Sequence, residues 1–422
     1  MGVKRRYVAL TLAAGTLAAS GCGRRNGRTG QGPYADMIAD AVPKVEKAVG
    51  VPFKTPPKFA VLTRTQVRDF LVKKFDEETP GTELAGEEAA YKAFGLIPDS
   101  LDLRSFLVKL LTEQIVGYYD PATKELYIVQ GAPDDLVGVT VTHELVHALQ
   151  DQYVNLDSIQ HATGDNDRQM AAQAVIEGEA TYEQMAIMTG GANVARLLPG
   201  GWDRVREMIR DAQSSQPVFA SAPPMIQEEL LFPYLSGAEF IRRFKVHDPG
   251  KLPFHDMPVS TTQILHEAAY FDSVRDVPAL VALPATEGTT VYENNLGEFD
   301  TRLFLYQHTH DQTLATSASE GWDGGRYRIL KQRAGTAVVW VTVWHTTVDA
   351  AQFGDALGQV AERWYRTPNP SIAYTGQRTY RGSKRTVQVT PLTIAGRSVV
   401  LYVDVPTGSS TKLLNAAAIT LK

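Results

Sequence analysis

The stretch that decides this chain is Val139-Thr-Val-Thr-His143-Glu144-Leu-Val-His147-Ala-Leu-Gln-Asp151. Its apolar residues recur at intervals of three and four, and residues 139–153 contain neither proline nor glycine, so the spacing predicts an amphipathic helix. Residues four apart lie on one face of a helix, so the two histidines project together. The opposite, apolar side is formed by Val141, Leu145, Ala148 and Leu149.

His143, Glu144 and His147 form an HExxH pattern. Two imidazoles at this spacing can bind one zinc ion, while the intervening glutamate faces a water on the metal. The pattern is therefore typical of the active-site helix of a metallopeptidase. Such a short pattern also arises by chance, so the alternative is a surface helix that happens to carry two histidines.

A third ligand is expected further along the chain, because a catalytic zinc site has three protein ligands and an open fourth position. The arrangement with a glycine and a third histidine after the motif does not fit, since Gln150 and Tyr153 stand at those places. His161, in a polar loop, is one candidate. A predicted helix over 165–189 offers Glu177 and Glu179, which lie about 200° apart around the axis, so only one can face the metal.

HExxH together with the later Glu177-Gly-Glu-Ala180 resembles the gluzincin group of zinc peptidases, in which Glu-x-x-Ala follows on a second helix. The resemblance implies a zinc-dependent peptidase with Glu177 as the third ligand. Ala174 and Ala180 fit that role, because small residues let a carboxylate approach the first helix. Thr181 departs from the pattern of members that place an aspartate there to support a zinc histidine, which leaves that partner open.

The wider chain also resembles a group of bacterial exported proteins. The segments that carry this resemblance are 113–120, 142–151, 232–237, 260–266 and 321–327. They extend over much of the chain after its first thirty or so residues. The resemblance implies a shared fold and site and names no substrate.

Length and composition indicate a globular protein of two domains, because 422 residues exceed what one core usually holds. The net charge of −5 gives no support for binding nucleic acid. With a single cysteine, the chain has no internal disulfide, so its stability must come from its cores.

Residues 1–22 have the pattern of an export signal: Lys4, Arg5 and Arg6 precede an uncharged stretch that ends in Ala19-Ser-Gly-Cys22. This resembles a bacterial lipoprotein signal, which implies a lipid on Cys22 and a membrane-anchored protein of the cell envelope. The alternative is an ordinary cleaved signal with a stray cysteine. Residues 23–33, rich in glycine and arginine, are then a flexible tether.

We expect an α+β fold, with a mainly helical, gluzincin-like metallopeptidase domain over 34–271 and a smaller α+β domain over 272–422. The first domain should hold a small antiparallel sheet, because residues 114–129 place an Asp-Pro turn at 120–124 between two β-rich runs. Residues 34–49 predict a helix interrupted near Pro43. In the second domain, strands are expected at 327–330, 337–343 and 398–405, with a tight turn at 322–325.

The predicted activity is hydrolysis of peptide bonds in a protein or peptide substrate, with Zn²⁺ on His143, His147 and Glu177 and with Glu144 as general base. His266 is the candidate donor for the oxyanion, and Tyr234 is the alternative. Two other functions stay open: a binding module on an inactive peptidase scaffold, and a zinc amidase that acts on the cell wall.

Overall fold

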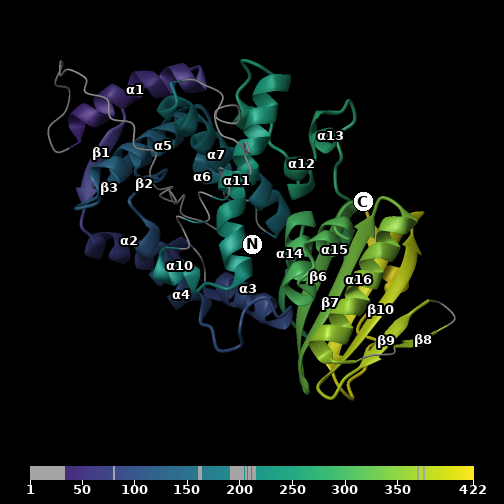
Figure 1. Ribbon diagram of the computed structural model, residues 1–422. Helices are drawn as coiled ribbons and strands as arrows, with labels where there is room; N and C mark the ends of the chain where they lie inside the picture. The colour runs from purple at the N-terminus through teal and green to yellow at the C-terminus, as the bar shows by residue number, and fades with distance from the viewer. Residues whose placement is uncertain are drawn as a thin grey trace.

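The structure is a computed structural model, in which a mainly helical part is followed by a sheet domain (Figure 1). The fold is α+β, as predicted. The structure describes residues 34–78, 81–159, 164–190, 204, 207, 211, 215–367, 370–373 and 376–422. The expected export signal, tether, Cys22 and His161 lie outside these residues.

The helical part precedes residue 272. Its helices are α1 (Ala35–Val49), α2 (Arg64–Glu78), α3 (Gly81–Ala93), α4 (Leu103–Gln114), α5 (Asp134–Tyr153), α6 (Leu156–Ile159), α7 (Asn166–Met188), α10 (Pro217–Ala220), α11 (Pro224–His247), α12 (Thr261–Leu265) and α13 (Glu267–Phe271), with a 3-10 turn, η1, at Pro253–His255. Across the helices searched in the described ranges, none combines the length and apolar character needed to span a membrane.

Helices α7 and α11 form the tightest pair in this part. Gly178 of α7 faces Gly237 of α11, and a Cβ added at Gly237 would lie 2.0 Å from the backbone oxygen of Ala174. Two facing glycines thus bring the helix backbones into direct contact. This close approach explains why a glycine stands inside α7 despite its cost of about 1 kcal/mol relative to alanine.

The small sheet beside α5 has the order β1-β3-β2, with β1 at Lys58–Leu62, β2 at Gly117–Asp120 and β3 at Glu125–Val129. β2 and β3 form the predicted antiparallel hairpin, closed by a hydrogen bond from Lys124 N to Asp120 O of 2.8 Å. The predicted antiparallel pairing is confirmed for β2 and β3, but the sheet is mixed, because β1 pairs with β3 in parallel. The connection from β1 to β3 passes through three helices, which allows the parallel pairing.

Helix α1 runs without a break through Pro43, so the predicted interruption is wrong. The helix buries Ile38, Ala41, Val45 and Val49 on one face. That face packs on α5 and α7. Burial of a continuous apolar face therefore outweighs the hydrogen bond that proline cannot donate.

The sheet domain is built on an antiparallel, seven-stranded sheet in the order β5-β6-β7-β11-β10-β9-β8. Its elements are β4 (Val281–Ala282), β5 (Thr289–Asn294), α14 (Glu298–Thr309), α15 (Gln312–Ser317), β6 (Trp322–Gln332), β7 (Gly335–Trp344), α16 (Thr347–Tyr365), β8 (Ser371–Ile372), β9 (Arg378–Arg381), β10 (Arg385–Ile394), β11 (Arg397–Pro406), η2 (Ala416–Ala418) and β12 (Thr420–Leu421). The expected tight turn at 322–325 is instead the irregular start of β6, where the register shifts.

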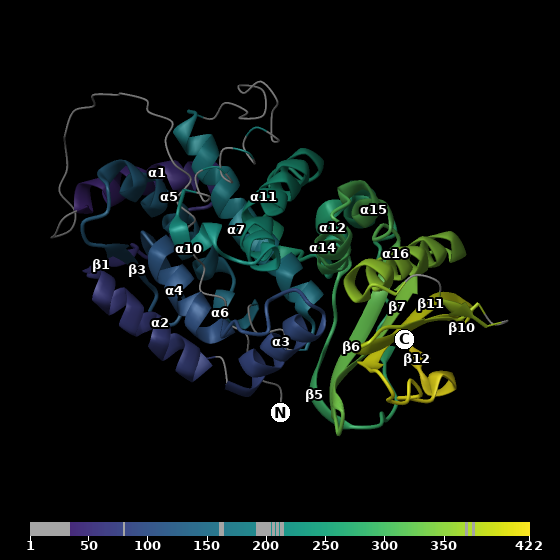
Figure 2. The same cartoon turned by 60° about the horizontal axis from the view of Figure 1, so that its bottom comes forward.

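Both faces of this sheet are covered (Figure 2). Trp340 of β7 packs in the core beneath α16, whereas its neighbour Val341 packs with Leu413 and Ile419 of the C-terminal segment. Because alternate residues face opposite covered sides, β7 is apolar from Ala337 to Trp344 except at Thr342. The C-terminal segment is therefore a structural layer of the domain.

The two parts share a core and a hydrogen-bonded boundary. Phe94, next to α3, packs edge-on against Trp340 with ring centroids 5.4 Å apart. At the start of α7, Asn166 N donates to Asn294 Oδ1 at 3.1 Å and Asp167 N to Asn295 Oδ1 at 3.2 Å. The first N–H groups of a helix have no partner within it, so the sheet domain completes the beginning of α7.

Candidate metal centre

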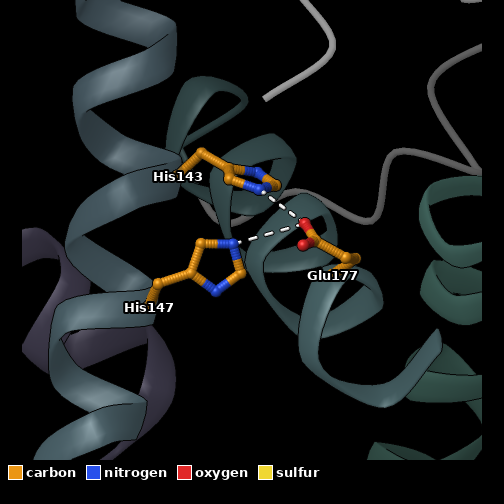
Figure 3. A group of neighbouring side chains, drawn as sticks. All are labelled: His143, His147 and Glu177. Carbon is orange, nitrogen blue, oxygen red and sulfur yellow. Dashed lines mark hydrogen bonds and ion pairs between the residues drawn. The ribbon is translucent and has the colours of Figure 1, made fainter. Parts of the chain in front are cut away.

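His143 and His147 on α5 point toward the carboxylate of Glu177 on α7 (Figure 3). Glu177 Oε2 lies 3.2 Å from His143 Nε2 and 3.3 Å from His147 Nε2. One donor atom from each residue lies within 4.8 Å of the other two. Two imidazole nitrogens and one carboxylate oxygen are the donor set of many catalytic zinc sites, so these residues fit a zinc ion.

The centre is buried on two packed helices. The side chains of both histidines are 1% exposed and that of Glu177 is 8% exposed. α5 supplies the histidines one turn apart, and its apolar side packs beneath them through Val141 and Leu145. Such donors are held by the core of the protein and do not depend on a loop for their positions.

The outer nitrogen of each imidazole is bound by a glutamine. His143 Nδ1 lies 3.0 Å from Gln184 Oε1, and His147 Nδ1 lies 2.9 Å from Gln150 Oε1. A carbonyl oxygen accepts from an N–H, so Nδ1 of each ring donates to its glutamine, and Nε2 is the nitrogen that faces Glu177. With a proton held on Nδ1, each ring can bind a metal ion through Nε2 once that nitrogen carries no proton.

The sequence interpretation missed these two glutamines as ring partners. Gln150 follows His147 by three residues, and Gln184 follows Glu177 by two helical turns, so each lies on the face of its helix that carries a ligand. That spacing could have indicated them. Thr181, considered as the place of such a partner, does not serve: its buried Oγ1 has no hydrogen-bond partner among the described residues.

Glu179 is also buried but belongs to a different contact. Its Oε2 accepts from Gln150 Nε2 at 2.8 Å, and the same amide nitrogen donates to Ile176 O. Glu179 therefore fixes the amide that orients His147 and lies outside the group of three donors. Of the two candidate glutamates, Glu177 is the one that meets the histidines.

Glu144 lies wholly buried beside the centre. Its Oε2 accepts from Tyr119 N of β2 at 2.7 Å, while its Oε1 has no hydrogen-bond partner within the described part of the chain. Burial raises the pKa of this carboxyl to about 8. The backbone of the hairpin thus fixes one oxygen and leaves the other for a water molecule or a substrate.

The charges of the centre favour a cation. Burial opposes ionisation of Glu177, but His147 and His143 outweigh it and lower the pKa of Glu177 to about 2. Burial also opposes a charge on His147, but Glu177 outweighs it and raises the pKa of His147 to about 9. One buried carboxylate between two imidazoles therefore requires a positive charge, which a proton or a metal ion can supply.

The hairpin is fixed to the metal-binding helix by Asp151. Its Oδ2 accepts from Tyr119 Oη at 2.7 Å and from Lys124 Nζ at 2.6 Å, so α5 is bonded to β2 and to the turn of the hairpin. Tyr119 thereby connects to α5 through its side chain and through its backbone, which contacts Glu144. The position of Glu144 thus depends on β2.

The two candidate oxyanion donors lie in different surroundings. The ring of Tyr234, on α11, stacks on that of His143 with centroids 5.9 Å apart. His266 follows α12 and its Nε2 lies 2.7 Å from Glu298 Oε1. His266 also lines a pocket whose lining includes neither His143 nor Glu177. The described contacts bring Tyr234, and not His266, to the group of three donors.

Comparison with known proteins bears on the sheet domain alone. One family model, described as a domain of unknown function (DUF8575), matches residues 286–414. The match begins before β5 and includes none of the three donors. No curated protein and no solved structure matches the chain.

Proposed function

We propose that the chain is a zinc-dependent endopeptidase of the gluzincin type. The observation that carries the proposal is the meeting of His143, His147 and Glu177 within ion-pair distance, beside a glutamate with one unpartnered oxygen among the described residues. A chance HExxH on a surface helix would not be expected to bring a carboxylate from a second helix to both Nε2 atoms.

In the proposed reaction, His143, His147 and Glu177 hold the zinc ion. Bound zinc supplies Lewis acidity to a water molecule and to the carbonyl of the substrate. Glu144 accepts the proton of the attacking water through Oε1 and then passes it to the leaving nitrogen. Tyr119 N keeps the other carboxylate oxygen in place during both transfers.

The oxyanion donor is assigned to Tyr234. Its ring stacks on that of His143, and the phenol group of a tyrosine can donate a hydrogen bond to developing negative charge. His266 stays an alternative prediction from the sequence. Its bond to Glu298 supports a structural role, because the nitrogen that would serve the oxyanion is already in an ion pair.

A peptide substrate is supported by the position of β2. This strand is last in the order β1-β3-β2, and its Tyr119 contacts Glu144. An extended peptide that added to this edge as a further strand would pass the candidate centre. For this reason we prefer peptide hydrolysis to cleavage of a cell-wall amide.

The export and anchoring proposal rests on residues 1–22 and Cys22 in the sequence. A lipid on that cysteine would hold the enzyme at the membrane of the cell envelope. Replacement of Cys22 with serine should move the protein from the membrane fraction to the soluble fraction. Unchanged membrane association would contradict the anchor without affecting the metal centre.

Glu144→Gln tests the enzyme proposal directly. We expect bound zinc to remain and the turnover of an unfolded protein substrate to fall about 10²- to 10⁴-fold, because the general base is removed. His143→Ala should lose both zinc and turnover, and Glu287→Gln, an exposed change in the sheet domain, should alter neither. Normal turnover by Glu144→Gln would overturn the mechanism.

The same assay separates the alternatives. Wild-type protein that cleaves cell-wall fragments and no unfolded protein would indicate the amidase. Wild-type protein that binds zinc and cleaves neither substrate would indicate a binding module.

A further inference from the structure

A second group of metal-binding side chains lies at the boundary between the helical part and the sheet domain. A pocket of about 670 Å³ opens there, lined by α12, α13, the segment after them and the ends of β6, β7 and β11. Asp276, Asp323 and His345 come from three separate segments, and one donor atom from each lies within 4.8 Å of the others. None of them has a part in the proposed hydrolysis.

We propose that Asp276, Asp323 and His345 form a second binding site, for a divalent transition-metal ion. His345 Nε2 lies 3.2 Å from Asp276 Oδ1 and 3.9 Å from Asp323 Oδ1. A single ion between the three atoms would replace this loose arrangement of donors with direct bonds. The pocket leaves room for water molecules to complete the coordination.

The backbones of all three donors are fixed before any metal binds. Asp276 N donates to Ala269 O at 2.9 Å, and Asp276 O accepts from Gln263 Nε2 at 2.5 Å. The backbone oxygen of Asp323 accepts from Ala279 N at 2.8 Å. The backbone N–H of His345 donates to Gly321 O at 2.9 Å. A site whose donors are already in place loses little conformational entropy when it binds an ion.

Asp323 is oriented through its second oxygen. Its side chain is 8% exposed, and its Oδ2 accepts from Arg397 Nη1 of β11. Oδ1 is the oxygen that faces His345. An outer partner of this kind holds a carboxylate ligand in position, as it does at established metal sites.

The donor set selects the class of metal. Calcium and magnesium prefer oxygen ligands alone, whereas an imidazole with carboxylates suits zinc and its neighbours in the first transition row. Two carboxylates also supply negative charge for a divalent ion, and Arg397 offsets part of that of Asp323. Zinc is therefore the suitable probe.

The pair His247 and Glu267 shows what distinguishes this group from an ordinary ion pair. His247 Nε2 lies 2.6 Å from Glu267 Oε1, and its side chain is 42% exposed, close to the 41% of His345. His247 meets one carboxylate in that pair, whereas His345 faces two. His247 is therefore a matched control for His345.

Equilibrium dialysis of the full chain against zinc, followed by metal analysis, tests the site. We expect two zinc ions per wild-type chain and one in His345→Ala. Asp276→Asn should also bind one, and His247→Ala should bind two. Retention of both ions by His345→Ala and by Asp276→Asn would overturn the proposal.

The variant His143→Ala separates this inference from the proposed function. It should retain one ion, at the boundary site, and the double variant His143→Ala/His345→Ala should bind none. A single ion in the wild type that is lost in His143→Ala would overturn the boundary site alone. A single ion that is lost in His345→Ala and kept in His143→Ala would instead overturn the peptidase centre.

Hydrogen exchange gives a second readout that does not depend on stoichiometry. In His143→Ala, zinc should slow amide exchange over residues 274–280, because the ion would join this segment to β6 and β7. The effect should vanish in His143→Ala/Asp276→Asn. Equal exchange with and without zinc in His143→Ala would contradict the site, even if His345→Ala did not fold.

Discussion

His147 and His345 each lie 3.2–3.3 Å from a carboxylate oxygen, but their surroundings differ. The side chain of His147 is 1% exposed and its outer nitrogen is bound by Gln150, whereas the side chain of His345 is 41% exposed at the rim of a pocket. The buried centre draws its donors from two packed helices, and the boundary site draws them from three separate segments after residue 272. Burial and fixed ring orientation should therefore give the first centre the tighter metal.

The largest effect is expected where the packing beneath the buried centre is broken. Gly237→Ala would place a Cβ 2.0 Å from Ala174 O, and no flexible side chain can move away. We expect a loss of about 3 kcal/mol or more of unfolding free energy, measured by urea denaturation, together with loss of zinc from the buried centre.

Gly138→Ala is the control for this change. Gly138 lies in α5, where an added Cβ would meet only the sulfur of Met37, at 3.9 Å. This variant should be neutral or up to about 1 kcal/mol more stable, since alanine favours the helix. Equal stability of the Gly237→Ala and wild-type proteins would show that α7 and α11 can separate without cost.

The next effect compares the tyrosine at the buried centre with the histidine at the boundary pocket. Tyr234→Phe should lower kcat by about 10²- to 10³-fold with zinc retained, because one oxyanion donor is lost. His266→Gln should leave kcat within a few-fold of the wild type. A large fall in kcat for His266→Gln, with Tyr234→Phe unaffected, would reverse the assignment.

A smaller effect is expected from the partners of the buried imidazoles. Gln184→Met fills a similar volume and removes the acceptor of His143 Nδ1, so zinc affinity should fall about 10- to 100-fold. A competing chelator measures this affinity. Gln173→Met, on the same helix, should keep the wild-type affinity. If both variants bind zinc equally, the ring orientation contributes nothing to binding.

The smallest effect concerns pH at the boundary pocket. The bond to Glu298 raises the pKa of His266, with burial and Arg302 opposing and Glu320 assisting. Because folding raises the pKa of His266, protonation of this side chain stabilises the fold. The stabilisation is complete at pH values below the usual pKa of about 6.5 and is lost as the pH rises through the raised pKa of the folded protein. His266→Gln should therefore lose stability at pH 5.5 and less at pH 9, by under about 1 kcal/mol because the side chain is 35% exposed.

Urea denaturation at the two pH values measures that difference. As a control, the double variant His266→Gln/Glu298→Gln is compared with Glu298→Gln alone. Without the Glu298 carboxylate, the stability difference caused by His266→Gln should no longer depend on pH. A stability difference that grows as pH rises would contradict the assignment of the ion pair.

Local spacing predicted the parts of the structure that depend on one segment. The helix of His143 and His147 and the hairpin at 117–129 follow from periodicity and from an Asp-Pro turn, and both are confirmed. The pairing of strands far apart in the chain could not be predicted from local spacing. β1 pairs with β3 in parallel, which the intervening helices allow. Pro43 remains inside a helix because packing on α5 and α7 outweighs local propensity.

The candidate site likewise combines residues whose proximity the sequence predicted with residues whose proximity it did not predict. His143 and His147 share a helix face, so their proximity follows from the sequence. The choice of Glu177 came from a resemblance, and the structure places its carboxylate 3.2 and 3.3 Å from the two imidazoles. Gln184 lies two helical turns after Glu177, a spacing that could have indicated it, but its partner His143 is 41 positions away and cannot be identified from spacing. Asp276, Asp323 and His345 form no local sequence pattern, since they lie on three segments that are far apart in the chain.

Two asparagines at the end of β5 connect the sheet domain to the helical part. Asn294 and Asn295 accept from the first amides of the helix that carries Glu177, although they lie more than a hundred positions later in the chain. A truncated chain ending before them would keep every ligand of the buried centre and lose two acceptors for buried donors. The sheet domain therefore cannot be exchanged for an unrelated domain without consequence. A domain that replaced it during evolution would have to place two side-chain oxygens at the beginning of α7.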